Sequence, residues 1–253
     1  MGSVVEDRAW LVRIHDRDGM TVGAGFAIGA ARVLTCAHVV QEAGAAGPGE
    51  SVHVEFPALG TCSRAEVLAE GWAPVRGTSG DVAVLALQDV PVGMRAAPVR
   101  VAYSLRGLTS SACGFPAGYD DGMWTNATLG LGVGRAWVQL DVSSSNAVEP
   151  GYSGSAVWSD EHGAVVAMMV TRDTKTRGRV AFAISIALMR GLFSPLDLDP
   201  ETATHWGPRS RGVSSDADAA GWLFRGRDLA LSELENWGAP RVIVGGSRVG
   251  LCV

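Results

Sequence analysis

The chain has 253 residues, of which 47% are hydrophobic and 19% are charged, and its formal net charge is -5. This length allows one large domain or two small ones with a buried core, so extensive disorder is not expected. The mildly acidic charge, without any basic run, argues against nucleic-acid binding.

The first twenty residues carry charges throughout and contain no apolar segment. We therefore expect neither a signal peptide nor membrane association, and a cytoplasmic location. The four cysteines form no CxxC pair, which favours buried free thiols over a zinc site or a disulfide framework. They are Cys36, Cys62, Cys113 and Cys252.

Short Val, Ala, Leu and Ile runs, separated by Gly, Pro, Asp and Ser, follow one another from residue 9 to about 190. In chain order they include AWLVRIH, GAGFAIG, RVLTCAHVV, SVHVEF, DVAVLAL, GAVVAMMV and RVAFAIS. Many short strands joined by turns are typical of an all-β sandwich or barrel. The best candidate for a helix in this region is a short one near ISIALMRGLF.

Ser153 lies in the segment EPGYSGSAVW, between Gly151 and Gly154. A serine nucleophile needs an imidazole to take its proton, a carboxylate to orient the imidazole, and backbone N–H groups facing the oxyanion. Flanking glycines let the backbone turn sharply and approach a substrate. Taken alone, however, the segment is equally typical of a tight turn.

His38 and Asp81 are the candidates for the imidazole and the carboxylate. His38 follows RVLTCA, at the expected end of an apolar strand, and Asp81 opens the strand DVAVLAL. Taken alone, His38 is more typical of a structural histidine and Asp81 is more typical of a turn residue. We expect the other histidines, His15, His53, His162 and His205, to face solvent.

The order His38, Asp81, Ser153, together with the neighbouring residues, resembles the trypsin-like (chymotrypsin-fold) serine peptidases. TCAH is similar to the family's Thr-Ala-Ala-His, GDVAVLAL to its Asp-Ile-Ala-Leu-Leu strand, and PGYSGSAVW to its Gly-x-Ser-Gly-Gly segment. The strands expected before the histidine and after the serine also resemble the family's, so the resemblance covers most of residues 9 to 190.

The resemblance implies two perpendicular six-stranded β-barrels with the site between them. His38 would be the general base and then the acid, Asp81 its orienting partner, and Ser153 the nucleophile. The N–H groups of Gly151 and Ser153 would form the oxyanion hole, without a metal or cofactor. The floor of the primary substrate pocket would lie around Ala147, which offers no acidic partner and favours a small-to-medium apolar side chain.

Three departures from the family pattern bear on activity. Tyr152 replaces an aspartate that pairs with a freshly cut N-terminus in many extracellular members, although intracellular and HtrA-like members lack it too. Ser155 replaces a glycine and adds a hydroxyl beside the nucleophile. The family's disulfides are missing, which agrees with a reducing cytosol. The alternative to a peptidase is therefore a catalytically silent or partner-activated peptide-binding module on the same fold.

The composition changes after about residue 200. We expect a peptidase domain over 1–200, a linker over 201–221 and a short, partly helical C-terminal extension over 222–253. WLFRGRDLALSELENW followed by RVIVGGSRVG resembles the opening of a STAND-type P-loop NTPase module. Leu251 and Cys252 stand where a phosphate loop needs lysine and Ser or Thr, so nucleotide binding is not expected. The extension could instead contact an NTPase or another regulatory partner.

Overall fold

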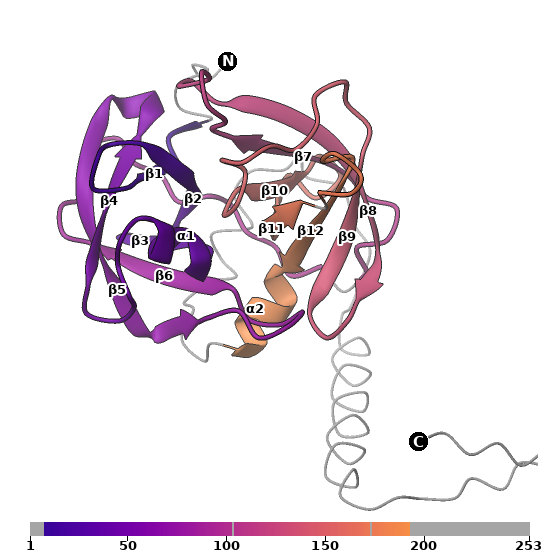
Figure 1. Ribbon diagram of the computed structural model, residues 1–253, viewed down its shortest axis with the longest axis horizontal. Helices are drawn as coiled ribbons and strands as arrows, with labels where there is room; N and C mark the ends of the chain where they lie inside the picture. The colour runs from indigo at the N-terminus through magenta and orange to yellow at the C-terminus, as the bar shows by residue number, and fades with distance from the viewer. Residues whose placement is uncertain (1–7, 103, 173, 193–253) are drawn as a thin grey trace, which may run out of the picture. The chain divides into compact units, whose positions relative to one another are not determined.

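Twelve strands form two closed six-stranded barrels in the computed structural model, which describes residues 8–102, 104–172 and 174–192 (Figure 1). The first barrel has the order β1-β2-β3-β6-β5-β4, with neighbouring strands antiparallel. Its strands are β1 (Leu11–His15), β2 (Thr21–Ile28), β3 (Arg32–Thr35), β4 (Ser51–Phe56), β5 (Thr61–Ala73) and β6 (Val82–Leu87). Helix α1 (Ala37–Glu42) follows β3, and a short 3₁₀ turn, η2 (Pro57–Leu59), joins β4 to β5.

The second barrel repeats the same kind of antiparallel closure in the order β10-β11-β12-β9-β8-β7. Its strands are β7 (Thr109–Gly114), β8 (Met123–Val133), β9 (Trp137–Val142), β10 (Ala156–Ser159), β11 (Ala164–Arg172) and β12 (Val180–Ser185). Helix α2 (Ile186–Leu192) follows β12 directly. Because each barrel closes on itself, neither leaves a long open sheet edge.

Alternation of side chains along the strands builds the cores. In β4 the apolar residues Val52, Val54 and Phe56 are buried while the intervening positions are more exposed, as the two-residue period of a strand requires. Apolar packing also joins the barrels: Trp10, just before β1, stacks on Trp158 of β10 with ring centroids 6.2 Å apart. Both barrels belong to one compact unit, so groups from each can share a site.

The all-β class, the two six-stranded barrels and the short helix near residue 186 were predicted from the sequence and are confirmed. The position of His38 at the end of a strand was wrong. Strand β3 ends at Thr35, Cys36 has extended backbone angles at the helix N-cap, and His38 lies in the first turn of α1. Strands β5, β7, β8, β9 and β10 were not identified individually from the sequence.

The predictions for the linker, the NTPase-like segment and the C-terminal extension lie outside the described residues. Over the part of the chain that is described, no helix has the length and apolar character to span a membrane.

Candidate active site

The end of β3 and the beginning of β6 bring His38 and Asp81 together. The β3–β6 register pairs Thr35 with Ala83, so the residues just after β3 lie beside those just before β6. The Asp81 carboxylate accepts hydrogen bonds from the His38 main-chain N–H (3.0 Å) and from His38 Nδ1, at 2.8 Å to Oδ2 and 3.0 Å to Oδ1. Because a carboxylate only accepts, Nδ1 must carry the proton, and Nε2 of neutral His38 keeps its lone pair.

Asp81 is held in an unusual environment for a carboxylate. Its side chain is 2% exposed, and its backbone φ of 70° is in the left-handed region that non-glycine residues rarely adopt. Gly80 before it also has a positive φ, of 74°. Strained backbone of this kind persists only where the surroundings enforce it, and it concentrates at functional sites.

The pKa of His38 reflects this partner. Burial, the largest single influence, lowers the pKa, but the hydrogen bond and charge of Asp81, with the charge of Glu42, outweigh it and raise the pKa above its ordinary value. The neutral ring can therefore accept a proton readily, as a general base must.

Ser153 comes from the second barrel and is attached to the first. Its carbonyl accepts a hydrogen bond from Ala24 N of β2 at 2.8 Å. A Cβ atom added to Gly23 of β2 would lie 2.6 Å from Val39 Cγ2 of helix α1 and 3.0 Å from Ser153 O. Gly23 therefore contacts both the Ser153 loop and helix α1. Among the described residues, Ser153 Oγ and His38 Nε2 make no hydrogen bond, a looseness that is common before substrate binds.

The residues before Ser153 form a turn that requires glycine. Tyr152 N donates to Glu149 O at 3.4 Å, with Pro150 and Gly151 at the central positions. Gly151 has a φ of 104°, as the third position of a type II turn demands. A Cβ atom there would lie 2.6 Å from the Phe115 carbonyl carbon and 2.9 Å from Pro116 N.

The backbone donors of this loop divide into two groups. Tyr152 N, Gly154 N and Ser155 N are bonded to the carbonyls of Glu149, Met169 and Tyr152 respectively. The N–H groups of Gly151 and Ser153 donate to no acceptor in the part of the chain that the structure describes. Two unpaired N–H groups, one on Ser153 itself and one on Gly151 two residues before it, are the donors that an oxyanion site needs.

The ligand atoms of Cys36, His38 and Asp81 lie within 4.8 Å of one another, which raises the question of a metal. Cys36 Sγ donates to Met169 O at 3.4 Å, and burial, followed by the charge of Asp81, raises the pKa of its thiol. A thiol must lose its proton to bind a metal, and both Asp81 oxygens are already bonded to His38. These residues do not fit a cation, and their contacts instead hold His38 in place.

Ala147, the predicted pocket residue, is half-buried in the segment that leads to the Ser153 turn. The next residue, Val148, donates its N–H to Gly178 O at 3.0 Å, so the β11–β12 connection frames this segment. The role of Ala147 in specificity stays a prediction.

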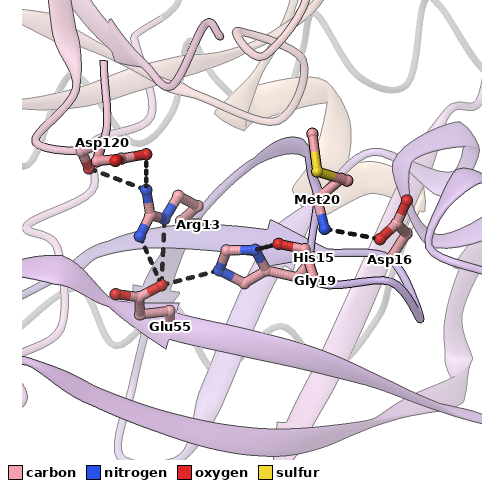
Figure 2. A network of polar contacts seen from close by, with 7 residues as sticks. All are labelled: Arg13, His15, Asp16, Gly19, Met20, Glu55 and Asp120. Atoms are coloured by element: carbon pink, nitrogen blue, oxygen red, sulfur yellow. Dashed lines mark hydrogen bonds and ion pairs between the residues drawn. The ribbon is translucent and has the colours of Figure 1, made fainter. Parts of the chain in front are cut away.

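An ionic network between the barrels was missed in the sequence, where all spare histidines were expected to face solvent. Figure 2 shows Arg13 of β1 between Glu55 of β4 and Asp120 in the β7–β8 connection, with both ion pairs at 2.8 Å. His15 was placed wrongly, because its side chain is 15% exposed and Nε2 lies 2.8 Å from Glu55. The Arg13 guanidinium also lies 5.9 Å from the centre of the Phe115 ring.

Residues 23–168 match the family of trypsin-like peptidase domains, a stretch that includes His38, Asp81 and Ser153. The chain belongs to this family. A comparison with curated proteins gives no match.

Solved structures show the same fold. The Rv3671c protease of M. tuberculosis, in an inactive form, is 21% identical, with a TM-score of 0.57 over 76% of this chain and 91% of that one. The HtrA-type protease AlgW with a tripeptide is 22% identical, with a TM-score of 0.57 over 74% of this chain and 60% of AlgW. Human heparin binding protein is 16% identical, with a TM-score of 0.59 over 83% of this chain and 98% of that one. Proteins described as proteases and as a binding protein thus share the fold, so function has to be argued from the site.

Proposed function

We propose that this protein is a serine endopeptidase that cleaves protein or peptide substrates through an acyl-enzyme. The observation that carries the proposal is the environment of Ser153. Its own N–H and that of Gly151 are unpaired while the other N–H groups of the loop are bonded. The adjoining barrel supplies a histidine whose tautomer is fixed by a buried carboxylate.

In the proposed reaction, Ser153 Oγ attacks the substrate carbonyl carbon while His38 Nε2 takes the hydroxyl proton. Asp81 stabilises the imidazolium through Nδ1–H, and the N–H groups of Gly151 and Ser153 bind the oxyanion. Collapse of the tetrahedral intermediate breaks the peptide C–N bond, and His38 returns its proton to the leaving amine. Water, deprotonated by His38, then attacks the acyl-enzyme, which releases the acid and restores the serine hydroxyl.

The biological setting belongs to the proposal as well. We place the protein in the cytoplasm, as the effector part of a bacterial defence or signalling system, with a small-to-medium apolar side chain bound near Ala147. The thiols of Cys36, Cys62 and Cys113 are free, which supports a reducing compartment. The resemblance of residues 222–253 to the start of a STAND module supports an NTPase or regulatory partner.

Labelling with a fluorophosphonate probe tests the activity without knowledge of the substrate. We expect wild-type protein to gain one phosphonyl group on Ser153, located by peptide mass spectrometry, and Ser153→Ala to gain none. A peptide library should be cleaved by the wild type above the Ser153→Ala background. If neither labelling nor turnover occurs while peptides still bind, the chain is the silent binding module instead.

A further inference from the structure

We infer that Tyr152 and Ser155, the two residues that depart from the family pattern, are positioning residues that hold the oxyanion turn in its receptive form. This inference rests on the proposed function, since it assigns the turn an oxyanion to bind. Neither side chain contacts the reacting atoms. Both reach from the nucleophile loop to one corner of the second barrel.

Tyr152 points into the protein, although Glu149 and Pro150 at the start of its turn are exposed. Its side chain is buried, and its hydroxyl donates to Met123 O, at the start of β8, at 2.8 Å. The ring lies on Gly114, the last residue of β7, where an added Cβ atom would be 2.6 Å from Tyr152 Cδ2. Gly114 and Met123 are paired in the β7–β8 ladder, so the ring and the hydroxyl contact one rung of the sheet.

Ser155 makes a second attachment to the same corner. Its buried hydroxyl donates to Cys113 O at 2.7 Å, one residue before Gly114. Its main chain is held as well, because Ser155 N donates to Tyr152 O and Met169 N donates to Ser155 O. The added hydroxyl therefore forms a bond that a glycine at this position could not form.

A third attachment fixes the turn itself. Phe115 N, next to Gly114, donates to Gly151 O at 3.0 Å. Positions 151, 152 and 155 are thus all tied to the end of β7 and the start of β8. The peptide group that carries the Ser153 N–H lies between these ties, and the one that carries the Gly151 N–H directly precedes the first of them, so the ties restrict where both donors point.

The chemistry of the two anchors suits a permanent attachment. Burial raises the pKa of the Tyr152 hydroxyl, so this group stays a neutral donor at any working pH. A buried hydroxyl that lost its acceptor would remain unsatisfied, which disfavours any arrangement that releases the side chain. Because a preorganised oxyanion site needs donors that do not reorient during reaction, such anchors act on the rate of acylation.

The test compares Tyr152→Phe and Ser155→Ala with a matched control. Ser110→Ala removes another buried serine hydroxyl that donates to a main-chain carbonyl, that of Ala127 at 3.1 Å, in the same β7–β8 ladder but away from the turn. We expect each anchor variant to lower the first-order fluorophosphonate acylation rate by about three- to tenfold with an unchanged probe binding constant. Ser110→Ala should leave the acylation rate and the probe binding constant unchanged, although we expect it to destabilise the fold about as much as Tyr152→Phe and Ser155→Ala do.

A second measurement does not depend on activity. In ¹H–¹⁵N spectra of the wild type and the variants, the Gly151 and Ser153 amide signals should shift or broaden in Tyr152→Phe and Ser155→Ala, and stay in place in Ser110→Ala. Unmoved amide signals in both anchor variants would overturn the inference. If the wild type is labelled, an unchanged acylation rate in both variants would overturn it as well. If the wild type is not labelled at all, the proposed function fails, and the amide signals alone decide whether the turn is anchored.

Discussion

Replacing Gly151 by alanine perturbs the proposed oxyanion site at one atom. The new Cβ would run into the Phe115 carbonyl, at 2.6 Å from its carbon and 2.9 Å from Pro116 N. These are main-chain atoms and cannot rotate away as a side chain could. The backbone φ of 104° is also unfavourable for alanine. The turn must therefore move, and the Gly151 N–H moves with it.

Gly151→Ala is expected to have two effects, the loss of an oxyanion donor and a strained backbone. Loss of one oxyanion donor lowers the rate by about 10²- to 10³-fold, or roughly 2.7–4 kcal/mol of transition-state stabilisation. Backbone strain adds a loss of folding stability of about 1–3 kcal/mol. Gly118→Ala separates the terms, because Gly118 has a φ of 85° in the β7–β8 connection and no atom within 4 Å of an added Cβ.

The assay is the second-order rate constant of fluorophosphonate labelling, with urea unfolding measured on the same samples. We expect Gly151→Ala to label at least a hundredfold more slowly than the wild type, while Gly118→Ala loses stability but labels at the wild-type rate. If Gly151→Ala is folded and labels within about threefold of the wild type, the Gly151 N–H does not bind the oxyanion, and the assignment of the turn is refuted.

Two further predictions concern charged groups. When the labelling rate is measured against pH, it should fall on the acidic side with a midpoint above the ordinary histidine pKa of about 6.5, because the pKa of His38 is raised. Asp81→Asn should lower that midpoint and slow the reaction by about 10⁴-fold. Arg13→Met should destabilise the protein to urea by about 1–3 kcal/mol, because it leaves the half-buried Glu55 without its main partner, whereas Asp120→Ala, at an exposed carboxylate, should cost under about 0.5 kcal/mol. The pKa of Glu55 is lowered in the folded protein, so the Arg13–Glu55 pair stabilises the fold above the usual glutamate pKa, and this stabilisation is lost as the pH falls through the Glu55 pKa. If Arg13→Met lowered the free energy of unfolding equally at neutral and at acidic pH, the prediction would be contradicted.

Local sequence was enough to predict an all-β fold of many short strands, whereas the two six-stranded barrels and the three candidate catalytic positions were predicted from the resemblance to the trypsin-like peptidases. Short apolar runs between frequent turn residues define strands without long-range information, whether the run alternates with polar residues, as in β4, or is continuous, as in β6. His38, Asp81 and Ser153 were identified together, because their order in the chain and the short motifs around them resemble those of the family. The turn at Ser153 also had a local signal, since Pro150 and Gly151 are the residue types that a type II turn prefers at its centre.

The contacts that orient the site were not predictable in the same way. Helix α1 has six residues and no side-chain N-cap bond, so its sequence is hard to distinguish from the end of strand β3. The anchors of Tyr152 and Ser155 are carbonyls of β7 and β8, two strands that the sequence did not define individually. Arg13 meets Asp120 across 107 positions of sequence, a pairing that only the packing of the two barrels creates.

The division of the site between the barrels explains which contact is left open. His38 and Asp81 are joined within the first barrel by the β3–β6 pair. The loop that carries Ser153 is tied to β7 and β8 of the second barrel through its neighbours Tyr152 and Ser155, and Ser153 itself adds one main-chain bond to β2. The step from Ser153 Oγ to His38 Nε2 crosses the interface between barrels, and it is the one link of the proposed triad that is not a hydrogen bond among the described residues. Changes inside a barrel should therefore alter the tautomer or the oxyanion site, whereas changes at the interface should alter the distance over which the proton is transferred.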